Sequence, residues 1–433
     1  MKKLAWIILF LVFLMLYSHA VKHVLEGGQR LGVFTKPIKE FALFFTTAKD
    51  AYSQIKKDHT DDIEEGNLAY TKLNVLSKDL YVLNPSFRKD LNTWRISLYN
   101  VKNGTEDLFW DIDESNWIDT KIVPRRRVLR HPVLLSDSSI VFIGENTHVI
   151  YRVSKTGELI WKARGYRFHH AINPEEEGFL WCCSKESCFV KQFDKYGVSF
   201  ESGGLAKLDV ETGEVVWEKP ISDIIIKNNK LSLLLGNGNG EGDKGKDPLH
   251  LNDVQIITKD SPWMKKGDLM ISLRNRSTIL HYRPKEDQLV NVITGDFLYQ
   301  HDVDYLNDSL ISIFNNNKSG IGPENFFRKN FDELESKYSL KTSNIHVYDL
   351  KNDCFYQPLD SILAEIGFFT HDQGLHEYLP GFGWILESQN QSDLVVVKGD
   401  SILHKGFLAL DNDGRKVDMN WARFYTNLDF LNN

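Results

Sequence analysis

The sequence predicts an all-β protein: a six-bladed β-propeller preceded by an N-terminal membrane or signal helix and a short helical stem. Three observations favour this fold. A histidine recurs at the start of a strand pair, two units end in the same turn and tryptophan, and successive histidines first recur after ~40 residues. That interval is the length of one four-stranded blade. The repeat therefore indicates a radial array with polar residues near its axis.

The chain begins with a candidate targeting element. Two lysines precede an uncharged apolar run over residues 4–17, and Ser18-His19-Ala20 follows. Positive charges, an apolar stretch of this length and small residues after it describe a secretory signal, whereas the bulky run fits an uncleaved membrane anchor equally well. Both interpretations of residues 1–20 stay open. Either one predicts that the body of the protein lies in the periplasm or another extracytoplasmic space.

The rest of the chain divides into a stem and the propeller. Residues 21–65 are expected to form an amphipathic helical stem, and residues 66–433 the six blades, of which the first fits residues 67–112. Two inserts interrupt the later repeats, a glycine-rich loop at residues 236–246 and a segment with a predicted helix at residues 319–339. We expect both inserts at the rim, where loops vary most freely.

The blade between His131 and His170 shows the repeat most clearly. Its four strands are expected at residues 132–135, 139–143, 148–153 and 158–162. The last strand follows a Thr-Gly-Glu turn and carries Trp161, and the next unit repeats the turn and carries Trp217. Gly-Glu allows a tight hairpin turn, and each tryptophan is expected to pack between neighbouring blades.

Propeller geometry brings the repeated polar residues together. The first strand of each blade lines the central channel, and its side chains alternate between faces, so equivalent positions face one axial cavity. The residues at these positions are His131, His170, Asn252, His301 and His376. His250 shares a strand face with Asn252, and the antiparallel second strand brings Arg274 to the same rim.

Composition excludes one class of partner and constrains the redox chemistry. A net charge of -7 argues against a nucleic-acid surface, which needs a basic stripe. Cys182, Cys183 and Cys188 form a cluster in which a disulfide from Cys188 to either neighbour is plausible in an oxidising compartment, and the pairing stays open. No second Cys/His pair stands at zinc-ligand spacing, so no metal is expected.

One arginine, one asparagine and several imidazoles in a small volume suit a tetrahedral oxyanion such as sulfate or phosphate. A neutral imidazole in that place can attack sulfur or phosphorus and carry the group covalently. The remaining donors would stabilise the charge that develops on the oxygen atoms. No carboxylate cage or metal-ligand spacing accompanies these residues. The sequence therefore predicts group transfer without a metal or a cofactor.

Several motifs, in order and approximate spacing, resemble those of the bacterial arylsulfate sulfotransferases. They are Phe168-His169-His170, Asp247-Pro248-Leu249-His250-Leu251-Asn252, Ser272-Leu273-Arg274 and Gln300-His301-Asp302. The resemblance covers about residues 128–318. It implies a six-bladed propeller that moves sulfate from one phenolic ester to another phenol by a ping-pong route, without PAPS. The implied partners are a small-molecule aryl sulfate donor and a phenolic acceptor.

The resemblance also implies roles for five residues. His301 matches the histidine that becomes sulfated, and Arg274 matches the sulfate-binding arginine. His250 and Asn252 match the donors of the family's His-x-Asn motif. His170 matches the second histidine of a His-His-Asp segment, as a proton carrier or sulfate ligand.

Two departures from the family pattern affect these expectations. Ala171 stands where the family has an aspartate after His170, which puts the orientation and basicity of that histidine in question. The N-terminal β-sandwich of some members is replaced by the predicted helical stem. Their mode of dimerisation is therefore not assumed, and the oligomeric state stays open.

Other interpretations of the same residues also stay open. The histidines could be packed channel residues, Arg274 could pair with Asp253, and His250 and Asn252 could hold neighbouring blades together. The whole chain could be a catalytically inactive propeller that binds sulfated or phenolic ligands, or a membrane-associated scaffold. A sulfate-ester hydrolase, with water as the acceptor, is a third possibility.

Overall fold

The computed structural model describes ten parts of the chain and divides it into two compact units. The described residues are 2–25, 32–34, 37–38, 73–112, 128–145, 147–176, 178–185, 200–236, 247–318 and 342–432. Unit 1 comprises residues 1–69 and unit 2 residues 70–433.

Unit 1 contains the N-terminal helix. Helix α1 (Lys2–Leu25) exposes large apolar side chains such as Trp6 and Phe10, and the short 3-10 helix η1 (Gly32–Phe34) follows. Within the described part of the chain, no helix meets the length and apolarity needed to cross a membrane. Most of the predicted stem over residues 21–65 lies outside the described residues. The signal, the anchor and the stem therefore stay predictions.

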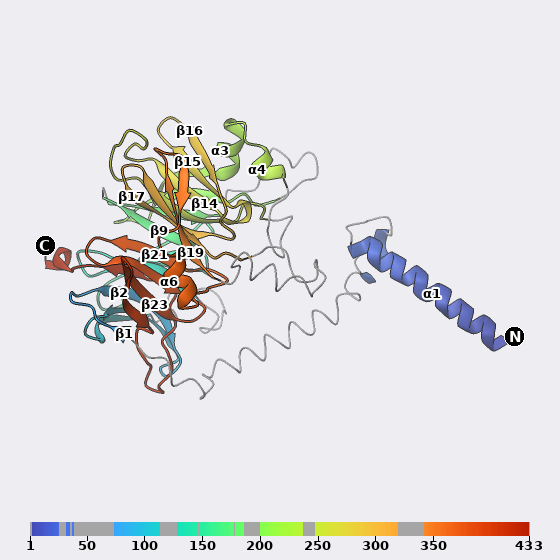
Figure 1. The fold of residues 1–433 in the computed structure, drawn as a ribbon, viewed down its shortest axis with the longest axis horizontal. Helices are drawn as coiled ribbons and strands as arrows, with labels where there is room; N and C mark the ends of the chain where they lie inside the picture. Colours follow the sequence, from blue (N-terminus) through green and yellow to red (C-terminus); the bar gives the residue numbers. More distant parts are fainter. Residues whose placement is uncertain are drawn as a thin grey trace. The chain divides into compact units, whose positions relative to one another are not determined.

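Unit 2 is a six-bladed β-propeller, as the sequence predicts, built from six antiparallel sheets (Figure 1). Blade 1 holds β25 (Arg423–Tyr425), β2 (Tyr81–Arg88), β3 (Thr93–Asn100) and β4 (Thr105–Ile112); blade 2 holds β5 (Leu129–Leu134), β6 (Ile140–Gly144), β7 (Val149–Val153) and β8 (Leu159–Ala163); blade 3 holds β9 (His169–Glu175), β10 (Phe179–Ser184), β11 (Gly204–Asp209) and β12 (Val215–Pro220).

Blades 4 to 6 follow the same order from the channel outward. Blade 4 holds β13 (Leu251–Ile256), β14 (Leu269–Leu273), β15 (Thr278–Arg283) and β16 (Gln288–Thr294); blade 5 holds β17 (His301–Asn307), β18 (Leu310–Asn315), β19 (Asn344–Asp349) and β20 (Cys354–Tyr356); blade 6 holds β21 (Leu375–Leu379), β22 (Gly383–Ser388), β23 (Asp393–Lys398), β24 (Ser401–Gly406) and β1 (Leu73–Asn74).

Both ends of unit 2 close the propeller. The C-terminal strand β25 pairs with β2 and becomes the innermost strand of blade 1, with Tyr425 opposite Tyr81. The short strand β1 pairs with β24 at the outer edge of blade 6, with Leu73 opposite Lys405. The sequence predicts three of the strands of blade 1 within residues 67–112, and these are present as β2 to β4. The tail supplies the fourth strand, which sequence analysis left unassigned.

The predicted strands of blade 2 are confirmed to within a few residues by β5 to β8. Trp161 of β8 packs against blade 3, where its Nε1 donates to the carbonyl of Val210 at 3.0 Å. Gly213, in the β11–β12 turn, has φ 73°, and a side chain there would collide with the Trp161 ring. Trp217 lies edge-on to Trp181 of its own blade, with ring centroids 5.2 Å apart.

The innermost strands carry irregularities where they pair with the second strand of each blade. The register shifts near the start of β5, β9, β13 and β17. His131, His170, His250 and Asp302, which lie at or beside these shifts, adopt positive φ between 49° and 58°. A bulge of this kind re-aims a side chain, and a non-glycine residue at positive φ costs of order 1–3 kcal/mol. The strain therefore accumulates around the channel.

Three short α-helices and two 3-10 helices connect or extend the described blades of unit 2. They are α3 (Ile221–Lys227), α4 (Ser232–Leu235), η5 (Arg274–Arg276), α6 (Asp360–Glu365) and η8 (Asp429–Asn432). The loop predicted at residues 236–246 lies outside the described residues except for Gly236, and the predicted helical insert lies entirely outside them. Cys188 is also outside them, whereas Cys182 and Cys183 are fully buried and unpaired.

Candidate functional site

The first residues of the innermost strands converge on one group of aromatic and imidazole rings. The His170 ring centroid lies 5.4 Å from that of His250, 6.3 Å from that of His301 and 5.7 Å from that of Trp421. Together with Arg274, these residues form what we call the histidine site. Four of the five predicted site residues, His170, His250, Arg274 and His301, belong to it, although they come from three different blades.

His301, the first residue of β17, is held in a single tautomer. Its Nδ1 lies 2.7 Å from Oδ1 of Asn316 and 3.1 Å from the carbonyl oxygen of Tyr299, and both of these atoms are acceptors. Asn316 is itself oriented, because its Nδ2 donates to the carbonyls of Thr370 and Gln373. Nδ1 therefore carries the proton, and the lone pair is on Nε2.

The Nε2 atom of His301 is available for chemistry. It is buried and has no hydrogen-bond partner among the described residues. Burial, aided by the charge of Arg274, lowers the pKa of His301 to about 3. The ring is therefore neutral across the physiological range, which is the state that a nucleophilic imidazole requires.

His250, which directly precedes β13, is oriented by a carboxylate. Asp247 accepts from the backbone N–H of His250 at 2.9 Å and lies 3.1 Å from its Nδ1. Burial alone would raise the pKa of Asp247, but its contacts with His250 and Lys185 lower it below the ordinary range. The carboxylate thus stays ionised and holds Nδ1, while Nε2 of His250 is buried without a hydrogen-bond partner in the described structure.

His170 receives its carboxylate from the neighbouring blade. Glu145, just after β6, accepts from the backbone N–H of His170 at 2.9 Å, and its second oxygen lies 3.6 Å from Nδ1 of the same residue. His169 and His170 also share a contact of 2.8 Å between their Nδ1 atoms. Residue 171 is an alanine and offers His170 no carboxylate, whereas Glu145 places one beside the same imidazole. Sequence analysis missed it, because no local motif connects residues 145 and 170.

Asn252 is fully buried and turned toward the next blade. Its Nδ2 donates to the carbonyl of Gln300 at 2.8 Å, which ties β13 to the residue before His301. Its Oδ1 has no partner among the described residues. The side-chain amide of Asn252 therefore links blade 4 to blade 5, which agrees with the alternative that Asn252 holds neighbouring blades together.

Arg274 begins the 3-10 helix η5 directly after β14. Its backbone N–H donates to the carbonyl of His250 at 3.1 Å, and its guanidinium carbon lies 5.2 Å from the centre of the Tyr299 ring. Its Nε donates to Oδ1 of Asn275 at 3.2 Å, while the carboxylate of Asp253 accepts from the backbone N–H of Val303 at 2.8 Å and from Asn173 at 3.1 Å. Arg274 is thus held beside His250 and Tyr299, where its charge acts on His301.

The predicted ring of repeated polar residues forms only in part. His131 lies edge-on to Trp421 at 5.5 Å, and its Nδ1 accepts from the backbone N–H of Ile172. His376 does not reach this group: it stacks on Trp384 at 6.0 Å and bonds to Asp302. The expectation that His376 occupies a position equivalent to His301 is therefore wrong, because β21 pairs without the bulge seen in β17.

Trp421 fills the place that blade 1 contributes to the site. Both oxygens of the buried Glu387 accept from backbone N–H groups, one from Trp421 and one from Ala422, each at 2.8 Å. Trp421 has φ 52°, like the histidines at the starts of β5 and β9. Sequence analysis missed it because the tail shows no repeat, and a tryptophan does not match the histidine pattern.

Comparisons with known proteins identify one family. The model of the arylsulfotransferase (ASST) family matches residues 131–401, which is more than half of the chain. No curated protein matches the chain.

Solved structures give only distant likenesses. A protein of unknown function from Bacteroides caccae is 9% identical with a TM-score of 0.37, covering 79% of this chain and 94% of that one. A virginiamycin B lyase from Staphylococcus aureus is 9% identical with a TM-score of 0.35, covering 77% and 87%. A streptogramin B lyase is 10% identical with a TM-score of 0.39, covering 82% and 97%. At these values the three structures say nothing about the function of this chain.

Proposed function

Because this chain belongs to the arylsulfotransferase (ASST) family, we propose that it moves a sulfuryl group from a phenolic sulfate ester to a phenolic acceptor through a sulfohistidine at His301, without PAPS. One observation carries the proposal. His301 presents a neutral, buried Nε2 without a hydrogen-bond partner among the described residues, while its Nδ1–H is fixed by Asn316. The same ring lies beside the imidazole of His170 and within reach of the charge of Arg274, which is the setting that a nucleophile attacking an oxyanion ester needs.

The first half-reaction forms the covalent intermediate. The lone pair of His301 Nε2 attacks the sulfur atom of the donor, and an N–S bond forms while the bond from sulfur to the aryl oxygen breaks. The aryl oxygen leaves with the electron pair of that bond and takes up a proton. The imidazole becomes positively charged, and the contact from Nδ1–H to Oδ1 of Asn316 stabilises that charge.

Cationic and imidazole groups would stabilise the transferring sulfuryl group. Arg274 is the cation whose charge acts on both His301 and His250. His250 has a second buried Nε2, and it becomes a donor when the imidazole takes up a proton, a charged form that the contact of Nδ1 with Asp247 favours. Donors aimed at developing negative charge in a buried site contribute more than they would in water.

The second half-reaction regenerates the enzyme. The acceptor phenol attacks sulfur as its proton passes to a base, and the N–S bond breaks to restore the neutral imidazole of His301. His170 is the candidate base, because its ring lies 6.3 Å from that of His301 and Glu145 lies 3.6 Å from its Nδ1. The same residue, once protonated, would protonate the leaving phenolate in the next cycle.

The test measures release of 4-nitrophenol from 4-nitrophenyl sulfate by the purified chain, with and without phenol. We expect phenol to stimulate release, phenyl sulfate to appear, and the protein without acceptor to gain the mass of one SO₃ on the peptide containing His301. His301→Ala should lose at least ~10³-fold in kcat/KM. His148→Asn is the matched control, because His148 lies outside the site and asparagine tolerates its φ of 57°.

Each alternative gives a different result. Release that phenol does not stimulate, with free sulfate as the product, would indicate a hydrolase. A folded protein that binds 4-nitrophenyl sulfate without releasing 4-nitrophenol would indicate a binding module. Full activity of His301→Ala would refute the assignment of the nucleophile.

The proposal includes a compartment. We place the propeller in the periplasm or another extracytoplasmic space, because residues 2–20 have the charge and apolarity of a secretory signal or anchor. The N-terminal sequence of the mature protein, together with its distribution between soluble and membrane fractions, distinguishes a cleaved signal from an anchor. Recovery of the unprocessed chain with cytoplasmic markers would contradict both.

A further inference from the structure

The axial channel contains a second polar site, further along the innermost strands than the histidine site. A cavity of about 150 Å³ is lined by residues from all six innermost strands or the residues that lead into them. Its acidic lining consists of Asp302, Asp304 and Glu377, and His376 and Arg423 also face it. We call this group the carboxylate pocket.

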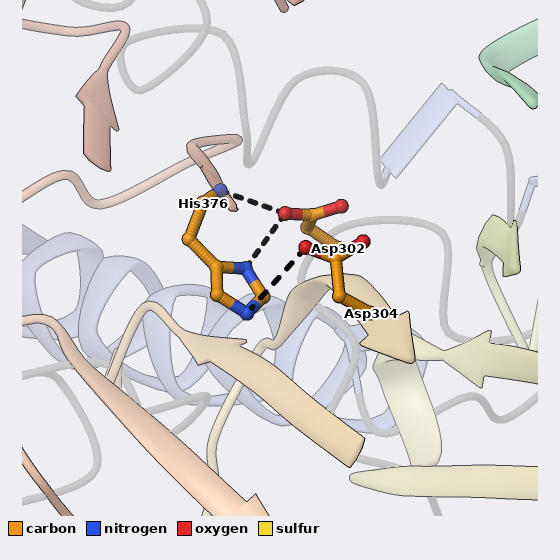
Figure 2. A group of neighbouring side chains, drawn as sticks. All are labelled: Asp302, Asp304 and His376. Atoms are coloured by element: carbon orange, nitrogen blue, oxygen red, sulfur yellow. Dashed lines mark hydrogen bonds and ion pairs between the residues drawn. The ribbon is translucent and has the colours of Figure 1, made fainter. Parts of the chain in front are cut away.

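An ordered pair of side chains forms the centre of this pocket. Figure 2 shows one carboxylate oxygen of Asp302 facing both Nδ1 and the backbone nitrogen of His376. This oxygen, Oδ2, lies 2.7 Å from each of the two nitrogens. The Nε2 atom of the same ring lies 3.9 Å from Oδ2 of Asp304. A carboxylate on one nitrogen of a histidine, with the other nitrogen turned toward further ligands, is the usual arrangement at protein metal sites.

One oxygen of this pocket lacks a hydrogen-bond partner in the described structure. Oδ2 of Asp304 is buried and accepts no hydrogen bond from the described residues, although Asp304 lies directly beside the His376 ring. A buried carboxylate oxygen in this state is costly unless a proton or a cation reaches it. The orphaned oxygen therefore points to a ligand in the cavity.

The charges of the pocket do not balance. Asp302, Asp304 and Glu377 face one guanidinium, that of Arg423. Arg423 donates from Nε to the carbonyl of Pro132 and from one Nη to the carbonyl of Ile172 and, at 3.5 Å, to Oδ1 of Asn173, so none of these hydrogen bonds goes to the acids. Such an excess of acidic groups, one buried and two half-buried, needs either protons or a cation.

We propose that the carboxylate pocket binds one divalent cation, Mn²⁺ or an ion of similar chemistry, between Nε2 of His376 and the carboxylate of Asp304, while Asp302 holds the other ring nitrogen. One donor atom from each of these residues lies within 4.8 Å of the other two. Ligands bonded at about 2.1 Å to one ion lie ~3–4 Å apart, and Nε2 of His376 and Oδ2 of Asp304 are already 3.9 Å apart. Mixed imidazole and carboxylate ligands suit Mn²⁺ better than the strictly oxygen-seeking Ca²⁺.

Binding would also rearrange one hydrogen bond. The hydroxyl of Ser312 lies 2.7 Å from Nε2 of His376 and occupies the lone pair that a cation needs. A serine hydroxyl rotates freely, so Ser312 can release Nε2 and present its own oxygen to the ion. The cation would then connect β17 and β21, the first strands of blades 5 and 6, and this role does not depend on the chemistry proposed for His301.

The test uses the full chain, stripped with EDTA and titrated with MnCl₂. Electron paramagnetic resonance measures the free Mn²⁺ that remains at each addition. We expect one Mn²⁺ bound per chain, displacement by Zn²⁺ and little displacement by Ca²⁺. We also expect the melting temperature of the stripped protein to rise on addition of Mn²⁺.

Two variants locate the site. Asp304→Asn removes the orphaned charge while keeping the shape, and it should weaken Mn²⁺ binding at least ~10-fold. Asp308→Asn makes the same change at an exposed position four residues after Asp304 and outside the pocket lining, and it should bind as the wild type does. Glu377→Gln provides a second test should Asp304→Asn fail to fold. The absence of stoichiometric Mn²⁺ binding, or unchanged binding by a folded Asp304→Asn, would overturn the proposal.

Discussion

The histidine site and the carboxylate pocket share one channel and respond to burial in opposite ways. His301 and Asp302 are neighbours in the chain, yet one side chain lies among imidazoles and the other among carboxylates. Burial lowers the pKa of His301 to about 3 and raises the pKa of Asp302 well above its ordinary range. An imidazole becomes neutral by losing a proton, whereas a carboxylate needs to gain one or to bind a cation.

This difference explains why one site can be reactive and the other can be a binding site. Loss of the proton leaves His301 with a nucleophilic lone pair that no described residue uses. Burial of Asp304 leaves an oxygen that no described residue satisfies. One lone pair can attack an electrophile, and the other can hold a cation. The same low dielectric therefore prepares group transfer in one site and ion binding in the next.

After the loss of His301 itself, substitution of Arg274 is expected to cause the largest fall in kcat/KM. Arg274→Met keeps the length of the side chain but removes the cation that faces the transferring group, so kcat/KM for 4-nitrophenyl sulfate should fall about 10²–10³-fold. Lys318→Met is the matched control, because Lys318 also lies over the Tyr299 ring, at 5.6 Å. It should lose no more than about 10-fold. Equal losses in the two variants would show that general positive charge, rather than Arg274, stabilises the sulfuryl group.

A smaller fall in activity is expected when the proton of His301 is no longer fixed on Nδ1. Asn316→Ala removes the acceptor at 2.7 Å from Nδ1, so the proton can move to Nε2 and block the nucleophile. We expect kcat to fall about 10–100-fold with little change in KM.

Asn315→Ala is the control for this change, since Asn315 directs its amide to Asn344 and His346 instead. It should lower the melting temperature without changing kcat once folded. A matching loss of kcat in Asn315→Ala would mean that Asn316 acts through the stability of the blade alone.

The blades were predictable because their signals are local. The histidine interval and the Thr-Gly-Glu turns lie within single blades, and β5 to β8 appear where these patterns place them. His170, His250, Arg274 and His301 were predictable for a related reason: each is at a fixed position in a blade, and closure of the propeller brings such positions together.

The other parts of both sites depend on contacts between distant segments. Glu145 reaches His170 from another blade, and Trp421 arrives with a tail that shows no repeat. His376 was placed with the other histidines, but a difference of one bulge directs it to Asp302, 74 residues earlier in the chain. Sequence periodicity identifies a position in a strand, whereas a bulge decides which way the side chain at that position points.

A modest effect should follow from loosening His250. Asp247→Asn weakens the contact at 3.1 Å to Nδ1 of His250, so the imidazole can rotate and kcat/KM should fall ~10-fold. The control is Glu201→Gln, because Glu201 pairs with the same Lys185 at 3.5 Å without touching His250. Only the first variant should change the steady-state rate. If both variants lose activity equally, Asp247 contributes to the rate through its ion pair with Lys185 and not through the orientation of His250.

A prediction on stability rather than on rate is a pH dependence that separates buried imidazoles from buried carboxylates. Burial lowers the pKa of His301 to about 3, so between pH 6.5 and 3 the unfolded chain binds a proton that the folded chain does not. Stability should therefore fall as pH drops through this window, by up to about 1.4 kcal/mol per pH unit for this one group. Burial raises the pKa of Glu387 to about 7, so stability should fall as pH rises from 4.5 to 7.

Urea unfolding of the EDTA-stripped protein between pH 4 and pH 8 measures both slopes. His301→Gln should flatten the acid side and leave the slope near neutral pH unchanged, because glutamine cannot take up the proton. Glu387→Gln should do the reverse. An acid slope that survives in His301→Gln would mean that the other buried histidines, His131 and His170, dominate the proton uptake, since burial lowers their pKa values as well. The neutral imidazole of His301 would then need a direct measurement by NMR before the nucleophile could be compared with its carboxylate neighbours.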